Sequence, residues 1–226
     1  MTKLKICGMM HEDDVAFCCK AGVDILGFVV EYPTSVPWNL ARESAAPLIA
    51  RVDNRTKSCM VTGGEREKIL ALARMLHPDF IQLHYRESFD DTCFLTNSLM
   101  KLGIAVIKAI PVRSDGSYDL SEFASPEEAA KELSAAGVDM LLLDSRCADS
   151  PQAGSRKLNF DLYERVCRAS SVPVVLAGGL CSRCLGEVIR LFSPPAVDIL
   201  TAAEYSPGVK HRGEIRKLVD IVSRGR

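Results

Sequence analysis

The chain has 226 residues, of which 47% are hydrophobic and 25% are charged, and its formal net charge is −1. This composition supplies enough apolar surface for a sizeable core, and the lack of a basic excess argues against nucleic acid or an anionic membrane as a partner. No apolar run reaches transmembrane length and the N-terminus lacks the apolar stretch of a signal peptide, so we expect a soluble, cytoplasmic protein.

Eight short apolar runs recur along the chain at intervals of about 20 to 35 residues, the spacing that βα units require. The runs are continuous rather than alternating, which is typical of strands buried on both faces in a parallel sheet. They cover residues 4–7, 25–30, 58–62, 80–83, 104–109, 140–144, 174–177 and 197–200.

Helical patterns separate these runs. Residues 12–21, 65–76, 182–192 and 213–222 carry apolar positions at helical spacing, and Ser125 followed by Pro126 predicts the start of another helix. Residues 114–125 form a longer, more polar connection, which we expect to be a loop over one face. The alternation predicts one α/β domain over residues 1–226, an eight-stranded parallel (β/α)₈ TIM barrel, with a doubly wound open sheet as the alternative.

Polar residues at the ends of the predicted strands are the candidate functional residues, because barrel sites lie on the loops that follow the strands. Cys7 follows the first strand, His84 the fourth, and Asp144 ends the sixth. Gly178 and Gly179 join the seventh strand to a helix start, an arrangement whose backbone N–H groups can bind phosphate. Each candidate also has a structural interpretation. Cys7 is then a buried core thiol and His84 a side chain that bonds a neighbouring backbone group. Asp144 is then the N-cap of the next helix, and the two glycines form an ordinary turn.

These strand ends, in this order, resemble those of the phosphoribosylanthranilate isomerase family. The resemblance covers nearly the whole chain and includes KICGM at 5–9, GFVV at 27–30, QLH at 82–84, VIKAI at 106–110, LLD at 142–144 and LAGGL at 176–180. It implies that Cys7 is the general base and Asp144 the general acid of an Amadori rearrangement. It also implies a small phosphorylated substrate, no cofactor and no metal, because the iminium intermediate is itself the electron sink.

The segments expected to hold the substrate depart from the family pattern. The resemblance places an arginine for the anthranilate carboxylate at the position of Pro37, and a glycine-containing phosphate element at Ala202 and Ala203. Backbone N–H groups of Ala202 and Ala203 can still bind phosphate. Three arginines follow strand ends and are candidates to replace the family's carboxylate-binding arginine: Arg86, Arg113 and Arg146. We include Arg113 in the predicted site.

Four further residues have two interpretations. Lys108 lies inside the fifth strand, where a buried ammonium needs a partner, so we expect it to face the substrate or an ion pair. Cys181 and Cys184 form a CxxC at a helix start, which favours structural thiols over a metal or redox site because the sequence lacks a second such pair. Trp38 either caps the altered loop or covers the rim of the barrel.

The sequence therefore predicts a phosphoribosylanthranilate isomerase of tryptophan biosynthesis, acting as a monomer or homodimer. Cys7 and Asp144 are the predicted catalytic pair, and Gly178, Gly179, Ala202, Ala203, His84, Lys108 and Arg113 the predicted substrate- and phosphate-binding residues. One alternative is a paralogous isomerase that applies the same chemistry to a different phosphosugar. The other is a barrel that binds a phosphorylated ligand without catalysis.

Overall fold

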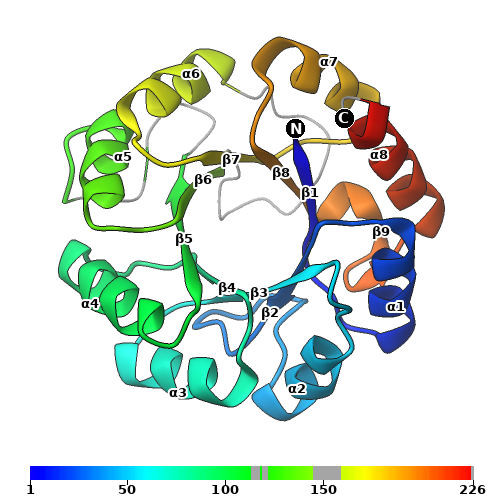
Figure 1. Ribbon diagram of the computed structural model, residues 1–226, viewed down its shortest axis with the longest axis horizontal. Coiled ribbons are helices and arrows are strands. Elements are labelled where there is room, and N and C mark those ends of the chain that lie inside the picture. The colour runs from blue at the N-terminus through cyan, green and yellow to red at the C-terminus, as the bar shows by residue number, and fades with distance from the viewer. Residues whose placement is uncertain (113–117, 119–121, 145–158, 225–226) are drawn as a thin grey trace.

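Eight parallel strands of the computed structural model close into a barrel in chain order, and helices surround it (Figure 1). The structure describes residues 1–112, 118, 122–144 and 159–224. The predicted (β/α)₈ barrel is thereby confirmed. No helix in these described ranges is long and apolar enough to cross a membrane.

The barrel strands lie within two residues of their predicted positions. A short hairpin, β9 and β10, follows the last of them and was not predicted. The strands are β1 (Lys3–Ile6), β2 (Ile25–Val29), β3 (Lys57–Thr62), β4 (Phe80–Leu83), β5 (Ala105–Pro111), β6 (Met140–Asp144), β7 (Val174–Ala177), β8 (Ala196–Ile199), β9 (Glu204–Ser206) and β10 (Val209–Lys210).

Two of the helices show local sequence signals at their ends. Gly22 ends the first helix with φ of 90°, and the Ser125 side chain accepts from the Glu128 backbone N–H at the start of the fifth. The helices are α1 (Glu12–Ala21), α2 (Arg42–Ala50), α3 (Arg66–Leu76), α4 (Phe89–Met100), α5 (Pro126–Ala135), α6 (Phe160–Ala169), α7 (Ser182–Phe192), α8 (Arg212–Arg224) and the 3₁₀ turn η1 (Thr201–Ala203).

Side chains on the barrel strands alternate between two buried layers. On β1, Leu4 and Ile6 pack in the layer between barrel and helices, whereas Cys7 belongs to the inner cluster inside the barrel. Period-two alternation therefore places Lys5 inside the barrel as well. The inner layer carries the polar groups that a barrel enzyme presents at its mouth.

Lys5 of β1 forms a buried ion pair with a residue of the neighbouring strand β8. Its ammonium lies 2.6 Å from the Asp198 carboxylate of β8, and the two side chains are 1% and 5% exposed. Burial opposes a charge on Lys5, but Asp198, with smaller contributions from Cys7 and Cys59, raises the lysine pKa above its ordinary value. Lys5 is therefore a charged group within the interior, held by its strand neighbour.

Replacing Lys5 by methionine should lower the free energy of unfolding by about 3–5 kcal/mol, because it leaves a buried carboxylate without its cation. Asp198 Oδ1 already lacks a hydrogen-bond partner among the described residues. Lys57→Met is the matched control, since Lys57 pairs with Asp79 at 2.7 Å but is 55% exposed, and its loss should cost under about 1 kcal/mol. Urea unfolding measures both; equal losses would contradict the expectation.

Candidate active site

Cys7 lies at the carboxyl end of β1, inside the barrel mouth. The residue is 4% exposed, and its backbone N–H donates to the Ile199 carbonyl of β8 at 3.0 Å. Its sulfur rests against β2, because a Cβ built on Gly27 would lie 2.6 Å from Cys7 Sγ. Gly27 is thus the residue that leaves room for the thiol, and any larger residue there would displace it.

Asp144 lies at the carboxyl end of β6, at the same end of the barrel. It is 2% exposed and has the strand parity of Leu142, which belongs to the inner cluster. His84 follows β4, and its Nε2 lies 3.2 Å from Asp144 Oδ2. The structure therefore brings Asp144 and His84 into direct contact, and it places Cys7 at the same mouth, with β7 and β8 between the strands of Cys7 and Asp144.

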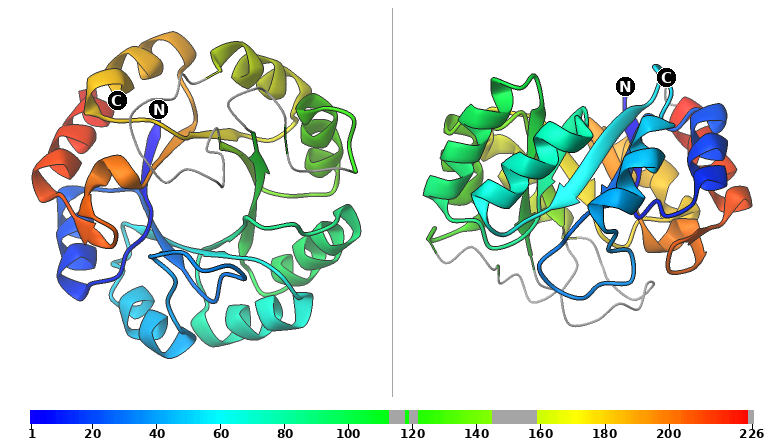
Figure 2. Two further views of the ribbon diagram at one scale, coloured as in Figure 1. Left: turned by 180° about the vertical axis from the view of Figure 1, so that it is seen from behind. Right: turned by 90° about the horizontal axis from the view of Figure 1, so that it is seen from below.

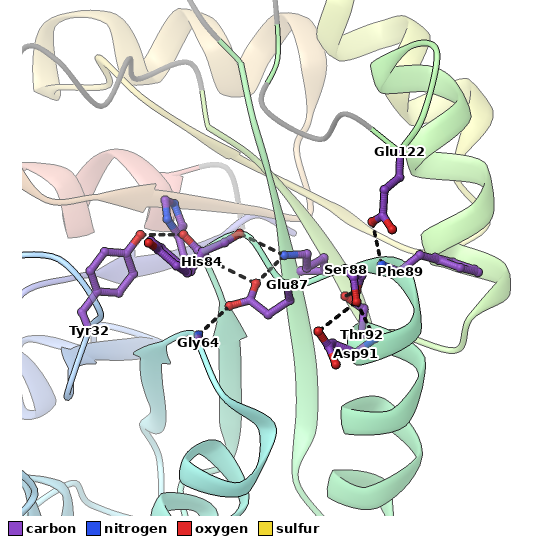
Figure 3. A network of polar contacts seen from close by, with 11 residues as sticks. Tyr32, Gly64, His84, Glu87, Ser88, Phe89, Asp91, Thr92 and Glu122 are labelled. Atoms are coloured by element: carbon purple, nitrogen blue, oxygen red, sulfur yellow. Dashed lines mark hydrogen bonds and ion pairs between the residues drawn. The ribbon is translucent and has the colours of Figure 1, made fainter.

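His84 is covered by the connection between β2 and α2. The Tyr32 hydroxyl donates to the His84 carbonyl at 2.7 Å, and the two rings lie 6.4 Å apart between centroids (Figure 3). Tyr85 packs edge-on against the same Tyr32 ring at 5.8 Å. These contacts hold the imidazole in place beside Asp144.

The Lys108 side chain lies on the helix-facing side of β5, whereas a substrate contact at the barrel mouth requires it to face inward. Its strand neighbours Val106 and Ile110 belong to the layer between barrel and helices, so alternation directs Lys108 to that layer. Its ammonium lies 2.6 Å from the Glu87 carboxylate, and both side chains are buried. Glu87 also accepts from the Gly64 backbone N–H (Figure 3). Of the two expected roles, the structure favours the ion pair, and Lys108 fixes loops rather than facing the mouth.

The expected phosphate turn follows β7. Gly178 and Gly179 have φ of 92° and 66°, so two consecutive residues adopt the left-handed conformation that favours glycine. The turn leads into α7, whose N-cap is Cys181. A strand, a glycine turn and a helix N-terminus together provide the geometry that binds phosphate through backbone N–H groups.

The segment after β8, where the resemblance places a glycine-containing element, forms the 3₁₀ turn η1. Ala202 lies in this turn and is not among the described residues with positive φ, so the loss of glycine causes no strain there. The Ala203 N–H donates to the Leu200 carbonyl at 3.0 Å and is engaged within the turn. A contact of Ala203 with phosphate stays a prediction. Arg113 and Arg146 lie outside the described residues.

A network that the sequence did not reveal joins three loops at the barrel mouth. Trp38 Nε1 donates to the Glu204 carboxylate at 3.0 Å, Glu204 pairs with Lys210 at 2.5 Å, and Lys210 Nζ donates to the Cys7 carbonyl at 2.5 Å. The partners are separated by up to 203 positions in the chain. The sequence offers one signal for this network, the opposite charges of Glu204 and Lys210 on either side of the Pro207-Gly208 turn.

Cys181 and Cys184 face each other at the start of α7. Their sulfurs are 3.8 Å apart, and the Cys181 backbone N–H donates to Cys184 Sγ at 3.3 Å. Desolvation acts to raise the pKa of Cys181, but bonds from the N–H groups of Arg183 and Cys184 outweigh it and lower that pKa. Across the described ranges, no group of three or more His, Cys, Asp or Glu side chains is placed to hold a metal ion.

Cys181 should be alkylated faster than Cys93 by iodoacetamide at pH 7. Both thiols are half-buried, but burial and the nearby Asp90 raise the pKa of Cys93. A lower pKa gives a larger thiolate fraction at neutral pH, and the thiolate is the reactive form. Peptide mass mapping over time measures the two rates. Faster modification of Cys93 would contradict the assignment of the lowered pKa to Cys181.

Comparison with known proteins agrees with this geometry. A family model described as N-(5'phosphoribosyl)anthranilate (PRA) isomerase matches residues 4–221. The chain is 33% identical to the N-(5'-phosphoribosyl)anthranilate isomerase of Methanopyrus kandleri, over 97% of both chains.

Solved structures carry the same fold. The phosphoribosyl anthranilate isomerase of Thermus thermophilus is 25% identical, is covered fully by the alignment as is this chain, and gives a TM-score of 0.78. A phosphoribosyl anthranilate isomerase in complex with reduced 1-(o-carboxyphenylamino)-1-deoxyribulose 5-phosphate is 24% identical over 99% of this chain and 100% of that chain, with a TM-score of 0.76. The chain belongs to the N-(5'-phosphoribosyl)anthranilate isomerase family.

Proposed function

We propose that this protein catalyses the Amadori rearrangement of N-(5'-phosphoribosyl)anthranilate with Cys7 as general base and Asp144 as general acid. The observation that carries the proposal is the placement of a buried thiol and a buried carboxyl, on different strands, at the same mouth of a barrel that belongs to this family. We expect the enzyme to act in the cytoplasm as a monomer or homodimer on this small phosphorylated substrate.

The rearrangement needs one general acid and one general base. Asp144 protonates the ring oxygen of the ribosylamine, and the C1–O bond breaks to give an open-chain iminium. Cys7, as thiolate, then removes the C2 proton, and the electron pair moves to form the enolamine. Protonation of the enolamine at C1 and loss of the proton from the C2 hydroxyl give the 1-amino-1-deoxyribulose product. Each proton that leaves the sugar is matched by one that returns.

His84 is a positioning residue in this proposal. Its Nε2 at 3.2 Å from Asp144 Oδ2 orients the carboxyl at the mouth, and Tyr32 in turn holds the His84 backbone. The Gly178–Gly179 turn and the start of α7 support phosphate binding. The ligand in the related complex is itself a 5-phosphate, which is consistent with a phosphate site in this barrel.

One observation favours a second candidate, an isomerase with the same acid–base pair and a different substrate. Pro37 stands in an exposed loop where the resemblance places the carboxylate-binding arginine, and a proline cannot pair with a carboxylate. Complementation of a tryptophan auxotroph that lacks this isomerase separates the two. Growth supports the proposed substrate, whereas no growth despite folded protein in the cell would overturn it and leave the second candidate.

A further inference from the structure

The connection between β2 and α2 is a built loop with a closed base. Leu40 N–H donates to the Val29 carbonyl at 2.9 Å and Glu31 N–H to the Leu40 carbonyl at 3.0 Å. The Asn39 side chain both accepts from and donates to the Tyr32 backbone, at 2.8 and 3.0 Å. In the right-hand view of Figure 2 this blue connection projects from the end of the barrel opposite the N-terminus. These bonds tie both ends of the loop together at the mouth of the barrel.

The Trp38 side chain in this loop is anchored by a carboxylate from another loop. Its Nε1 lies 3.0 Å from both carboxylate oxygens of Glu204. Glu204 is itself fixed by Lys210, and these two side chains are 4% and 0% exposed. A buried, charge-assisted partner fixes both the position and the plane of the indole.

The indole lies on the residue that follows the proposed base. A Cβ built on Gly8 would lie 2.8 Å from Trp38 Cδ1, so glycine is required for this approach. Trp38 also packs, with Tyr32 and Val36, against the inner cluster that contains Cys7. Both constrained atoms, Nε1 and Cδ1, belong to the pyrrole edge. The half-buried indole is thus anchored at one edge, beside the base, in the loop that lacks the expected arginine.

We propose that Trp38 contacts the aromatic ring of the substrate and so selects an aromatic amine on the sugar phosphate. The inference rests on the proposed function and adds the residue that recognises the amine. An anchored indole binds a flat ring at little entropic cost, since its position is set before the ligand arrives. Offset-stacked or edge-to-face ring pairs contribute beyond the area they bury. Trp38 thus provides an aromatic contact in the loop where the family arginine is missing.

The first test uses the emission of Trp38, which is the one tryptophan in the chain. The acrylamide bimolecular quenching constant is measured from fluorescence lifetimes with and without reduced 1-(o-carboxyphenylamino)-1-deoxyribulose 5-phosphate. Ribose 5-phosphate, which lacks the ring, is the control ligand. We expect the aromatic ligand to lower the constant and ribose 5-phosphate to leave it unchanged. An unchanged constant at saturation with the aromatic ligand would overturn the inference.

The second test compares Trp38→Leu with Trp38→Phe. Leucine keeps an apolar side chain but loses ring contact, so KM for N-(5'-phosphoribosyl)anthranilate should rise about 2- to 13-fold. Phenylalanine keeps a ring but loses the Nε1 bond to Glu204, so its KM should lie between those of the wild type and Trp38→Leu. Phe94→Leu, at a half-exposed aromatic position on α4, is the matched control and should leave KM unchanged. Thermal unfolding establishes that each variant is folded.

The outcomes separate this inference from the proposed function. If the wild-type protein neither turns over the substrate nor binds the aromatic analogue, the proposed function fails and the inference fails with it. If the wild type is active while Trp38→Leu retains the wild-type KM, only the role of Trp38 fails, and the indole is then a plug over Gly8.

Discussion

Replacing Cys7 by alanine is expected to lower kcat for N-(5'-phosphoribosyl)anthranilate by about 10² to 10⁴-fold, the range that one general base contributes. The cavity left by the thiol is small, and the bonds from Cys7 N–H to the Ile199 carbonyl and from Met9 N–H to the Gly27 carbonyl keep the backbone after β1 in place. The substrate should therefore still bind, and KM should change far less than kcat. Steady-state kinetics on the purified variant measures both constants.

Cys59→Ala is the matched control for this experiment. Cys59 is a fully buried thiol of the same inner cluster, and burial raises its pKa to about 12. It is therefore protonated at neutral pH and unable to act as a base. We expect Cys59→Ala to retain wild-type kcat. An equal loss of activity in both variants would mean that packing of the inner cluster, and not base chemistry, explains the Cys7 result.

Asp144→Asn should lower kcat by about 10² to 10⁴-fold, because an amide cannot protonate the ring oxygen. The substitution is nearly isosteric and keeps an oxygen for the contact with His84 at 3.2 Å, so the fold should be retained. Asp79→Asn tests a structural carboxylate at the opposite end of the barrel, where Asp79 contacts Ser58 and Lys57. Wild-type kcat in Asp144→Asn would remove Asp144 from the mechanism.

Much of the barrel could be predicted because its strands are continuous apolar runs with clear boundaries. Helix α2 could not be bounded, since Pro47 lies inside it and a proline normally indicates a helix end. Hairpin β9–β10 was missed because strands of three and two residues are too short to show a period.

The candidate site was predictable only as far as strand ends determine it. Cys7, Asp144 and His84 share the mouth because parallel strands end together. The direction of Lys108 was not predictable, because β5 is apolar on both faces and its sequence does not show which parity faces inward. Trp38 and Glu204 are 166 positions apart, and no local pattern connects them. Most of what the sequence alone could not predict therefore lies in the loops that follow the strands.

The altered loops and the retained acid–base pair are consistent with one another. A barrel enzyme places its chemistry at strand ends, which the fold fixes, and its specificity in loops, which tolerate substitution. Lys210 links the two by bonding the Cys7 carbonyl and the Glu204 carboxylate. The departure at Pro37 from the pattern of the resemblance therefore lies in a loop, while Lys210 holds the Cys7 backbone.

The most direct test of the account follows the conversion of N-(5'-phosphoribosyl)anthranilate deuterated at C2 by NMR, using wild-type protein, Cys7→Ala and Asp144→Asn. The account predicts that the wild type forms the 1-amino-1-deoxyribulose product with loss of the C2 deuterium, and that both folded variants convert the substrate at least about 10²-fold more slowly. Unconverted substrate with folded wild-type protein, or a wild-type rate in Cys7→Ala, would contradict it.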